Sequence, residues 1–254
     1  FPREKRKGLQ VGGKLDTLAR YSALIGVALA AVGFVLTFTV AGLVNGAAVD
    51  GVEVIGGVVV ANKLLLSQKI FFFHMPVAIA SMVLFLFAGY YCVRFLMKRD
   101  IAYDTRAKLC METGLVFVIC TMISGEMWTR FEWGVWWNWE PRLTTSLVLM
   151  LMVIAYFVLR NSIGDPERRA VYSAVVGILI LVDVPVCFMV TRLIPSSVHP
   201  VVLRADSGMS PEMIISLVLC LLGMLLIAFA LYRFRLRTQL MEDKLAAIQE
   251  KLED

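Results

Sequence analysis

Residues 213–232 read MIISLVLCLLGMLLIAFALY, a run of twenty positions without a charged side chain. An α-helix of about 20 apolar residues crosses the hydrocarbon core of a bilayer, so this run predicts a transmembrane helix. Five apolar runs precede it, at about 21–44, 70–97, 109–128, 143–159 and 171–192. Because lipid offers no partner for backbone N–H and C=O groups, helices are the expected spanning element. The sequence therefore predicts an all-α integral membrane protein, a bundle of six transmembrane helices.

The overall composition excludes a soluble cytosolic enzyme. The 254 residues are 59% hydrophobic with a mean hydropathy of +0.77, whereas soluble domains are about 45–50% apolar. The net charge of +5 comes without a basic face carrying polar base-reading side chains, so we expect no nucleic-acid partner. The five cysteines form no CxxC pair, which argues against a disulfide framework, a zinc site and covalent haem attachment.

The distribution of basic residues predicts the orientation of the bundle. Of the 25 Lys and Arg residues, 19 lie in the N-terminal arm, the second and fourth connections and the C-terminal tail, and 6 lie on the opposite side. By the positive-inside rule, both termini are expected in the cytoplasm. The first apolar run is too long for a signal peptide and ends without a small-residue cleavage site, so we expect an uncleaved first helix.

The chain divides into a six-helix transmembrane domain, residues 1–232, and a charged tail, residues 233–254. Leucine and isoleucine recur near helical spacing along the tail, which predicts a cytoplasmic amphipathic helix. Such a helix is either a solvated extension of the last membrane span or a docking element for a cytoplasmic partner.

The two histidines, His74 and His199, are the complete supply of imidazole in the chain. The predicted orientation puts both near the outward connections, 45–69, 129–142 and 193–212. Each could be a polar anchor at the membrane interface. As a pair on one side of the membrane, they could instead bind haem iron, zinc or copper.

All five tryptophans fall within residues 128–139, in the second outward connection. An aromatic belt would place tryptophan at several helix ends and at both interfaces, and the inner side here has none. Clustered indoles flanked by Glu140 and Arg142 suit a flat apolar ligand with a polar edge, because the rings supply rigid contact area and the charges hold the rim.

Residues 133–140, WGVWWNWE, resemble the tryptophan-rich WGxxWxWD motif of bacterial membrane proteins that handle haem in cytochrome c maturation. With the sequel Arg142-Leu143-Thr144 and the six-helix length, the whole chain is similar to the haem exporter protein C (CcmC) family, more than to the larger CcmF or the CcsA/ResC type. Glu140 stands where the motif usually has Asp, and Lys69 where the family more commonly has Arg.

The resemblance implies that the tryptophan-rich loop is periplasmic and that His74 and His199 are the axial ligands of a non-covalent b-type haem. The implied haem-binding residues are His74, His199, Trp133, Trp136, Trp137, Trp139, Glu140, Arg142 and Lys69.

The implied function is to bind haem at the periplasmic face of the bacterial inner membrane and to present it to the chaperone CcmE. The implied complex contains the ABC-transporter subunits CcmA and CcmB and the small protein CcmD. No nucleophile–base pair or GxxxxGK[ST] loop is present in the sequence, so we expect no enzyme activity, and ATP hydrolysis would belong to a partner.

Two other functions remain open on the residues alone. A bis-His membrane redox subunit would exchange electrons with quinone through haem held inside the bundle. A small-molecule permease would leave the histidines incidental. Asp183, an acid well inside the fifth apolar run and close to Pro185, is a secondary candidate, with either a functional or a structural role.

Overall fold

The computed structural model describes residues 13–42, 53–55, 58–60, 63–194 and 209–253, with side chains described from residue 68 onward in the second helix. The described residues contain six α-helices, and each is long and apolar enough to cross a membrane. They are α1 (Lys14–Thr39), α2 (Lys63–Lys98), α3 (Ile101–Trp133), α4 (Pro141–Ser162), α5 (Pro166–Leu193) and α6 (Pro211–Glu253). The predicted all-α, six-helix, multi-pass membrane fold is confirmed.

One element lies outside the helical prediction. Strands β1 (Glu53–Ile55) and β2 (Val58–Val60) pair antiparallel between α1 and α2, with Glu53 opposite Val60. The two strands are short β-branched runs separated in the sequence by Gly-Gly, a pattern typical of hairpins. Strands of three residues are too short to appear as apolar spans of about 20 residues.

The helix bounds differ from the apolar runs that predicted them. The second helix begins at Lys63 instead of 70, the third runs from Ile101 to Trp133 instead of 109–128, and the first ends at Thr39 instead of 44. Hydropathy marks only the stretch that hydrocarbon can cover, whereas helical hydrogen bonds continue until a cap ends them. Asp100 and Asp165 cap α3 and α5 through their side chains, so these helices begin before their apolar runs.

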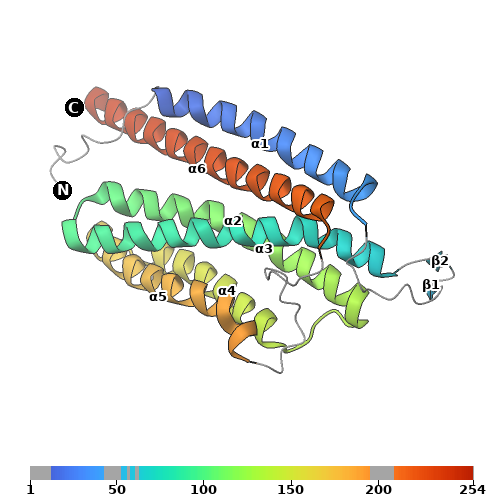
Figure 1. Ribbon diagram of the computed structural model, residues 1–254. Helices are drawn as coiled ribbons and strands as arrows, with labels where there is room; N and C mark the ends of the chain where they lie inside the picture. The colour runs from blue at the N-terminus through green and yellow to red at the C-terminus, as the bar shows by residue number, and fades with distance from the viewer. Residues whose placement is uncertain (1–12, 43–52, 56–57, 61–62, 195–208, 254) are drawn as a thin grey trace.

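Helices that follow one another in the chain run antiparallel, and α2 lies at the centre, antiparallel to α3 and α5 and parallel to α6 (Figure 1). The α1–α6 pair lies along one side of the bundle and the α4–α5 pair along the other, and α2 contacts α3, α5 and α6. Small residues let α1 and α6 approach closely. A Cβ at Gly33 would lie 2.6 Å from Cys220 Sγ, and one at Gly26 would lie 2.9 Å from the carbonyl oxygen of Gly223. We call this contact the glycine seam.

A buried ion pair joins α3 to α4. The Arg160 guanidinium donates to both carboxylate oxygens of Asp104, at 2.6 and 2.7 Å, and to the Tyr156 hydroxyl at 3.4 Å. Both charged residues are less than a tenth exposed. Asp104 is in the first turn of α3 and Arg160 in the last turn of α4, and these helix ends lie at the end of the bundle where α1 begins and α6 ends (Figure 1).

Candidate functional site

The candidate tryptophans, Glu140 and Arg142 lie at one end of the bundle, where α3 ends at Trp133 and α4 begins at Pro141 (Figure 1). We call it the tryptophan end. The connection here is shorter than the predicted loop 129–142, because α3 continues to Trp133. Gly134 stops the helix with φ of 74°, a left-handed conformation that glycine adopts at helix C-termini without strain. Trp128 and Trp133 therefore belong to α3, where their rings make an edge contact at 5.1 Å.

The other three tryptophans lie in the connection itself and form a largely exposed aromatic surface. Trp136 and Trp139 are 62% and 74% exposed, and Trp139 makes an edge contact with Trp137 at 5.6 Å. Arg130 holds the segment in place: its guanidinium donates to the carbonyl of Gly134 and lies over the Trp136 ring at 5.9 Å. Sequence reasoning missed Arg130, although its spacing four residues before Gly134 places it beside the end of the helix.

The indole nitrogen of Trp137 is buried and has no hydrogen-bond partner among the described residues. An unsatisfied buried donor costs about 1–3 kcal/mol, and most buried polar groups in proteins are therefore paired. The N–H group suits an acceptor brought by a ligand, such as a carboxylate. This atom is the feature of the tryptophan end that best fits a flat ligand with acidic edge groups.

Glu140 has a structural role that the sequence argument did not assign. It is 5% exposed, and its carboxylate accepts from the backbone N–H groups of Arg142 and Leu143 at 2.9 and 3.2 Å. It is therefore the N-cap of α4, followed by Pro141 at the first helical position. The carboxylate fixes the angle at which the tryptophan segment joins α4.

Arg142 and Asp183 lie where α4 and α5 meet. The Arg142 guanidinium is 3.5 Å from the carbonyl of Phe188 on α5. The Cys187 thiol is within 3.5 Å of the Asp183 carboxylate, one turn earlier on the same helix. Both polar groups thus contact neighbours within the α4–α5 pair.

Lys69, near the start of the described part of α2, is 8% exposed. Its ammonium donates to the carbonyls of Thr37 and Ala41, each at 2.5 Å. Thr37 is in the last turn of α1 and Ala41 follows its C-cap Val40, a region where backbone acceptors lack helical partners and the helix dipole favours a cation. Lys69 therefore joins α1 to α2 five residues before His74.

His74 lies on α2 and is half-buried, with Nδ1 3.0 Å from the hydroxyl oxygen of Ser124 on α3. His199 lies outside the described residues, so one of the two predicted ligands has a described position. Among the described residues, no group of three or more His, Cys, Asp or Glu side chains could hold a metal ion. A zinc or copper site with three such ligands would need at least one ligand from outside the described residues.

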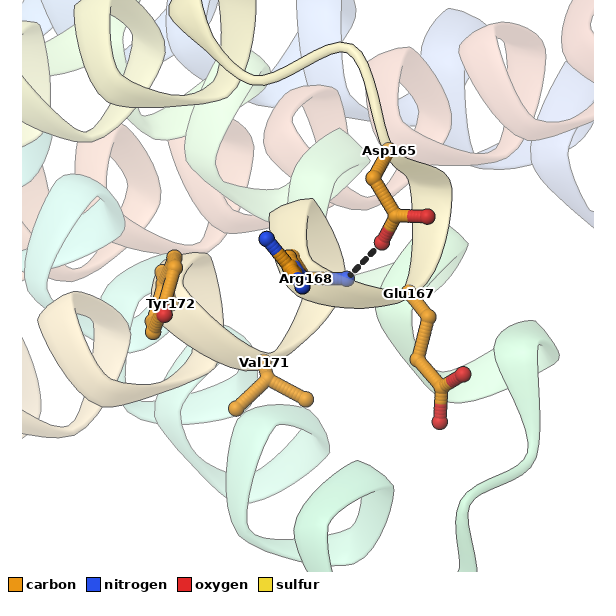
Figure 2. Close-up of a pocket in the computed structure, with 5 residues that line it drawn as sticks. All are labelled: Asp165, Glu167, Arg168, Val171 and Tyr172. Carbon is orange, nitrogen blue, oxygen red and sulfur yellow. Dashed lines mark hydrogen bonds between the residues drawn. The ribbon is translucent and has the colours of Figure 1, made fainter.

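A pocket at the start of α5 lies at the opposite end of the bundle from these residues. Figure 2 shows its lining, in which Asp165 accepts from the backbone N–H of Arg168 at 2.7 Å. The pocket is open and surrounds a helix cap, and none of the candidate residues lines it.

Comparison with known proteins assigns the family. The family model described as heme exporter protein C matches residues 61–251. The chain is 27% identical to heme exporter protein C of Paracoccus denitrificans (strain Pd 1222) over 186 residues, which cover 71% of this chain and 76% of that protein. It is 31% identical to the Bradyrhizobium diazoefficiens protein of the same name over 118 residues, 46% of this chain and 45% of that one.

A shorter match, 30% identical over 103 residues, joins the chain to cytochrome c biogenesis protein CcsA of Prochlorococcus marinus (strain MIT 9303), covering 41% of this chain and 31% of that protein. The extent of the family match, three quarters of the sequence and including the tryptophan-rich segment, is decisive. The chain belongs to the heme exporter protein C family.

Proposed function

We propose that this protein binds haem at the tryptophan end and presents it to the haem chaperone CcmE. Family membership supports a role in haem handling for cytochrome c biogenesis. The observation that carries the finer proposal is the exposed aromatic surface of Trp136 and Trp139, which follows the end of α3, the helix that His74 contacts at Ser124. Exposure suits a protein that must pass its ligand on, because a fully enclosed haem could not meet a second protein.

Each candidate residue has a proposed task toward a non-covalent b-type haem. His74 and His199 supply the axial nitrogens, since imidazole is a strong ligand of haem iron. Trp133, Trp136, Trp137 and Trp139 supply aromatic contact area, and the N–H of Trp137, which has no partner within the described part of the chain, donates to a propionate carboxylate. Haem itself carries the iron chemistry, and the protein binds, orients and exposes it.

The charged candidates act at the margin of the site. Arg142, on the first turn of α4, is the proposed contact for a propionate. Lys69 and Glu140 are already engaged with backbone groups, so we propose that they hold α1, α2 and α4 in place around the site. A propionate would have to compete with two carbonyls for Lys69.

We further propose that the tryptophan end faces the periplasm across the bacterial inner membrane, with both termini in the cytoplasm. The asymmetry of basic residues supports this orientation. So does the antiparallel arrangement, since α1 begins and α6 ends at the same end, away from the tryptophans (Figure 1). A complex with CcmA, CcmB and CcmD would supply ATP hydrolysis, and this chain would be its haem-binding, non-enzymatic subunit.

The test is an absorption spectrum of the detergent-purified protein, expressed with and without the chaperone. We expect a six-coordinate, low-spin haem spectrum in the protein alone and a haem–chaperone complex on co-expression. His74→Ala and His199→Ala should each lower haem content or give a five-coordinate spectrum. Unchanged Soret bands and haem content in both variants would remove the histidines as ligands. Rapid reduction by added quinol, without transfer to the chaperone, would favour the redox subunit.

A further inference from the structure

Two consecutive residues of α3, Ser124 and Gly125, hold the imidazole of His74. The Ser124 hydroxyl oxygen is 3.0 Å from Nδ1 of the ring. A Cβ on Gly125 would lie 3.1 Å from Cε1 of the ring and 3.6 Å from Nδ1. The ring edge therefore fills the space that Gly125 leaves, and its Nδ1 lies against the Ser124 hydroxyl.

The direction of the hydrogen bond follows from the other contacts of the hydroxyl. Ser124 Oγ is 2.7 Å from the carbonyl oxygen of Cys120 and 3.1 Å from that of Thr121. Carbonyl oxygens only accept, and a hydroxyl has a single proton, so this proton is directed to the backbone. The oxygen then offers a lone pair to His74, and the ring donates its Nδ1–H to Ser124.

A neutral imidazole protonated at Nδ1 has its lone pair on Nε2. A hydrogen bond accepted from the other ring nitrogen orients a metal-bound histidine and raises its basicity as a ligand. Ser124 thus favours the tautomer in which Nε2 can bind iron, and Gly125 leaves the space that the ring occupies.

We propose that Ser124 is a positioning residue for the axial ligand, fixing His74 in the tautomer that coordinates haem iron through Nε2, while Gly125 leaves room for the ring. The inference rests on the proposed function, because it requires His74 to be an axial ligand. It adds a residue that touches neither the iron nor the tryptophan surface.

The substitution Ser124→Ala removes the acceptor and leaves the helix otherwise intact. We expect haem affinity to fall about tenfold to a hundredfold, the usual effect of removing the partner of a ligating histidine. The midpoint potential of the remaining haem should become more positive, because a less basic imidazole stabilises ferric iron less. Ser124→Thr should restore both values, since Thr121 on the same helix already makes the equivalent bond to a backbone carbonyl.

Ser216→Ala is the matched control. Ser216 is a fully buried helical serine whose hydroxyl donates to the carbonyl four residues earlier, at 2.8 Å, on α6. The substitution Ser216→Ala removes the same atoms and the same kind of backbone hydrogen bond as Ser124→Ala. It does not remove the hydrogen bond with His74. Its haem affinity and potential should match those of the unsubstituted protein.

The measurement is a titration of haem-free protein in detergent with haemin, followed by redox titration of the complex. If Ser124→Ala gives no folded protein, Gly125→Ala takes its place: it keeps the hydroxyl and displaces the ring, and it should lower affinity and alter the low-spin spectrum. Unchanged affinity and potential in the folded variant, or equal changes in Ser216→Ala, would overturn the inference.

His74→Ala separates the two levels of the argument. If this variant keeps the coordination and the potential of the unsubstituted protein, His74 is no ligand and the proposed function fails. If His74→Ala loses the low-spin spectrum while Ser124→Ala keeps both its affinity and its potential, His74 remains a ligand and only the role of Ser124 fails.

Discussion

Trp137 combines two contributions that a single truncation would confuse. Its ring contacts Trp139, and its N–H is buried without a partner among the described residues. Trp137→Phe keeps most of the apolar area and removes the donor, whereas Trp137→Ala removes both.

We expect Trp137→Phe to hold haem somewhat more weakly and in a less uniform orientation, because one carboxylate contact is lost. Trp137→Ala should lose more haem, since an aromatic contact adds about 0.5–1.5 kcal/mol beyond burial. Haem per protein and the width of the Soret band measure the two effects. Equal, full haem retention in both variants would make the segment an interface anchor and nothing more.

At the residue scale, the sequence indicates the candidate site residues, but it does not indicate which side chains they contact. The tryptophan cluster and His74 were visible because both residue types are rare elsewhere in the chain. The contact between His74 and Ser124 depends on how α2 packs against α3, and no spacing within either helix encodes that register. The sequence predicts a ligand-edge role for Glu140, because a Glu before Pro can either face a ligand or cap a helix, and only the start of α4 at Pro141 identifies the cap.

At the scale of elements, the cap of α4 connects local stability to the site. Glu140→Ala should destabilise the first turn of α4 by about 1 kcal/mol, the usual cost of losing a capping side chain. Because the tryptophan segment ends at this cap, haem should also be held less uniformly. Glu140→Asp should behave like the unsubstituted protein, since Asp caps helices at least as well.

Hydrogen exchange at the amides of Arg142 and Leu143 measures the loss of the cap directly, and thermal unfolding in detergent measures its cost. If exchange at these two amides is unchanged in Glu140→Ala, the carboxylate does not cap the helix.

The ion pair between α3 and α4 gives a second prediction at this scale. Asp104→Ala leaves a buried guanidinium without its partner, and breaking such a pair costs about 3–5 kcal/mol. The double variant Asp104→Leu with Arg160→Met should recover much of that loss, because it removes both charges and keeps the apolar volume. Thermal unfolding of the three proteins in detergent measures the difference. A double variant no more stable than Asp104→Ala would show that the pair itself stabilises the bundle.

The elements also show where hydropathy stops being informative. The six spans can be predicted from composition, because a helix that crosses lipid needs about 20 consecutive apolar residues and few other elements have this pattern. The ends of α3 follow from the Asp100 cap and from Gly134, both outside its apolar run, and a 20-residue apolar window does not detect them. Strands β1 and β2 have three residues each, far fewer than the window.

At the scale of the whole molecule, orientation is the prediction with the widest consequences. In a variant lacking the native cysteines, Asn138→Cys in the tryptophan segment should react with a membrane-impermeant maleimide added to intact cells. Gln249→Cys, on the last turns of α6, should react only after the cells are opened. The reverse pattern would put the tryptophan end in the cytoplasm and separate the protein from periplasmic haem transfer.

α6 continues without interruption from its membrane-spanning part to Glu253, so movement of its C-terminal end would move the whole helix. Its 43 residues span roughly 64 Å, about twice the thickness of the hydrocarbon core. A stiff rod of this length turns a small sideways pull at its free end into a tilt along its whole axis. A tilt of α6 would act on α1 through the close contacts of the glycine seam. It would act on α2 through the hydrogen bonds of Lys69 to Thr37 and Ala41, one and a half turns from His74. Mechanical work done on the tail would thus reach the histidine without any ligand crossing the membrane.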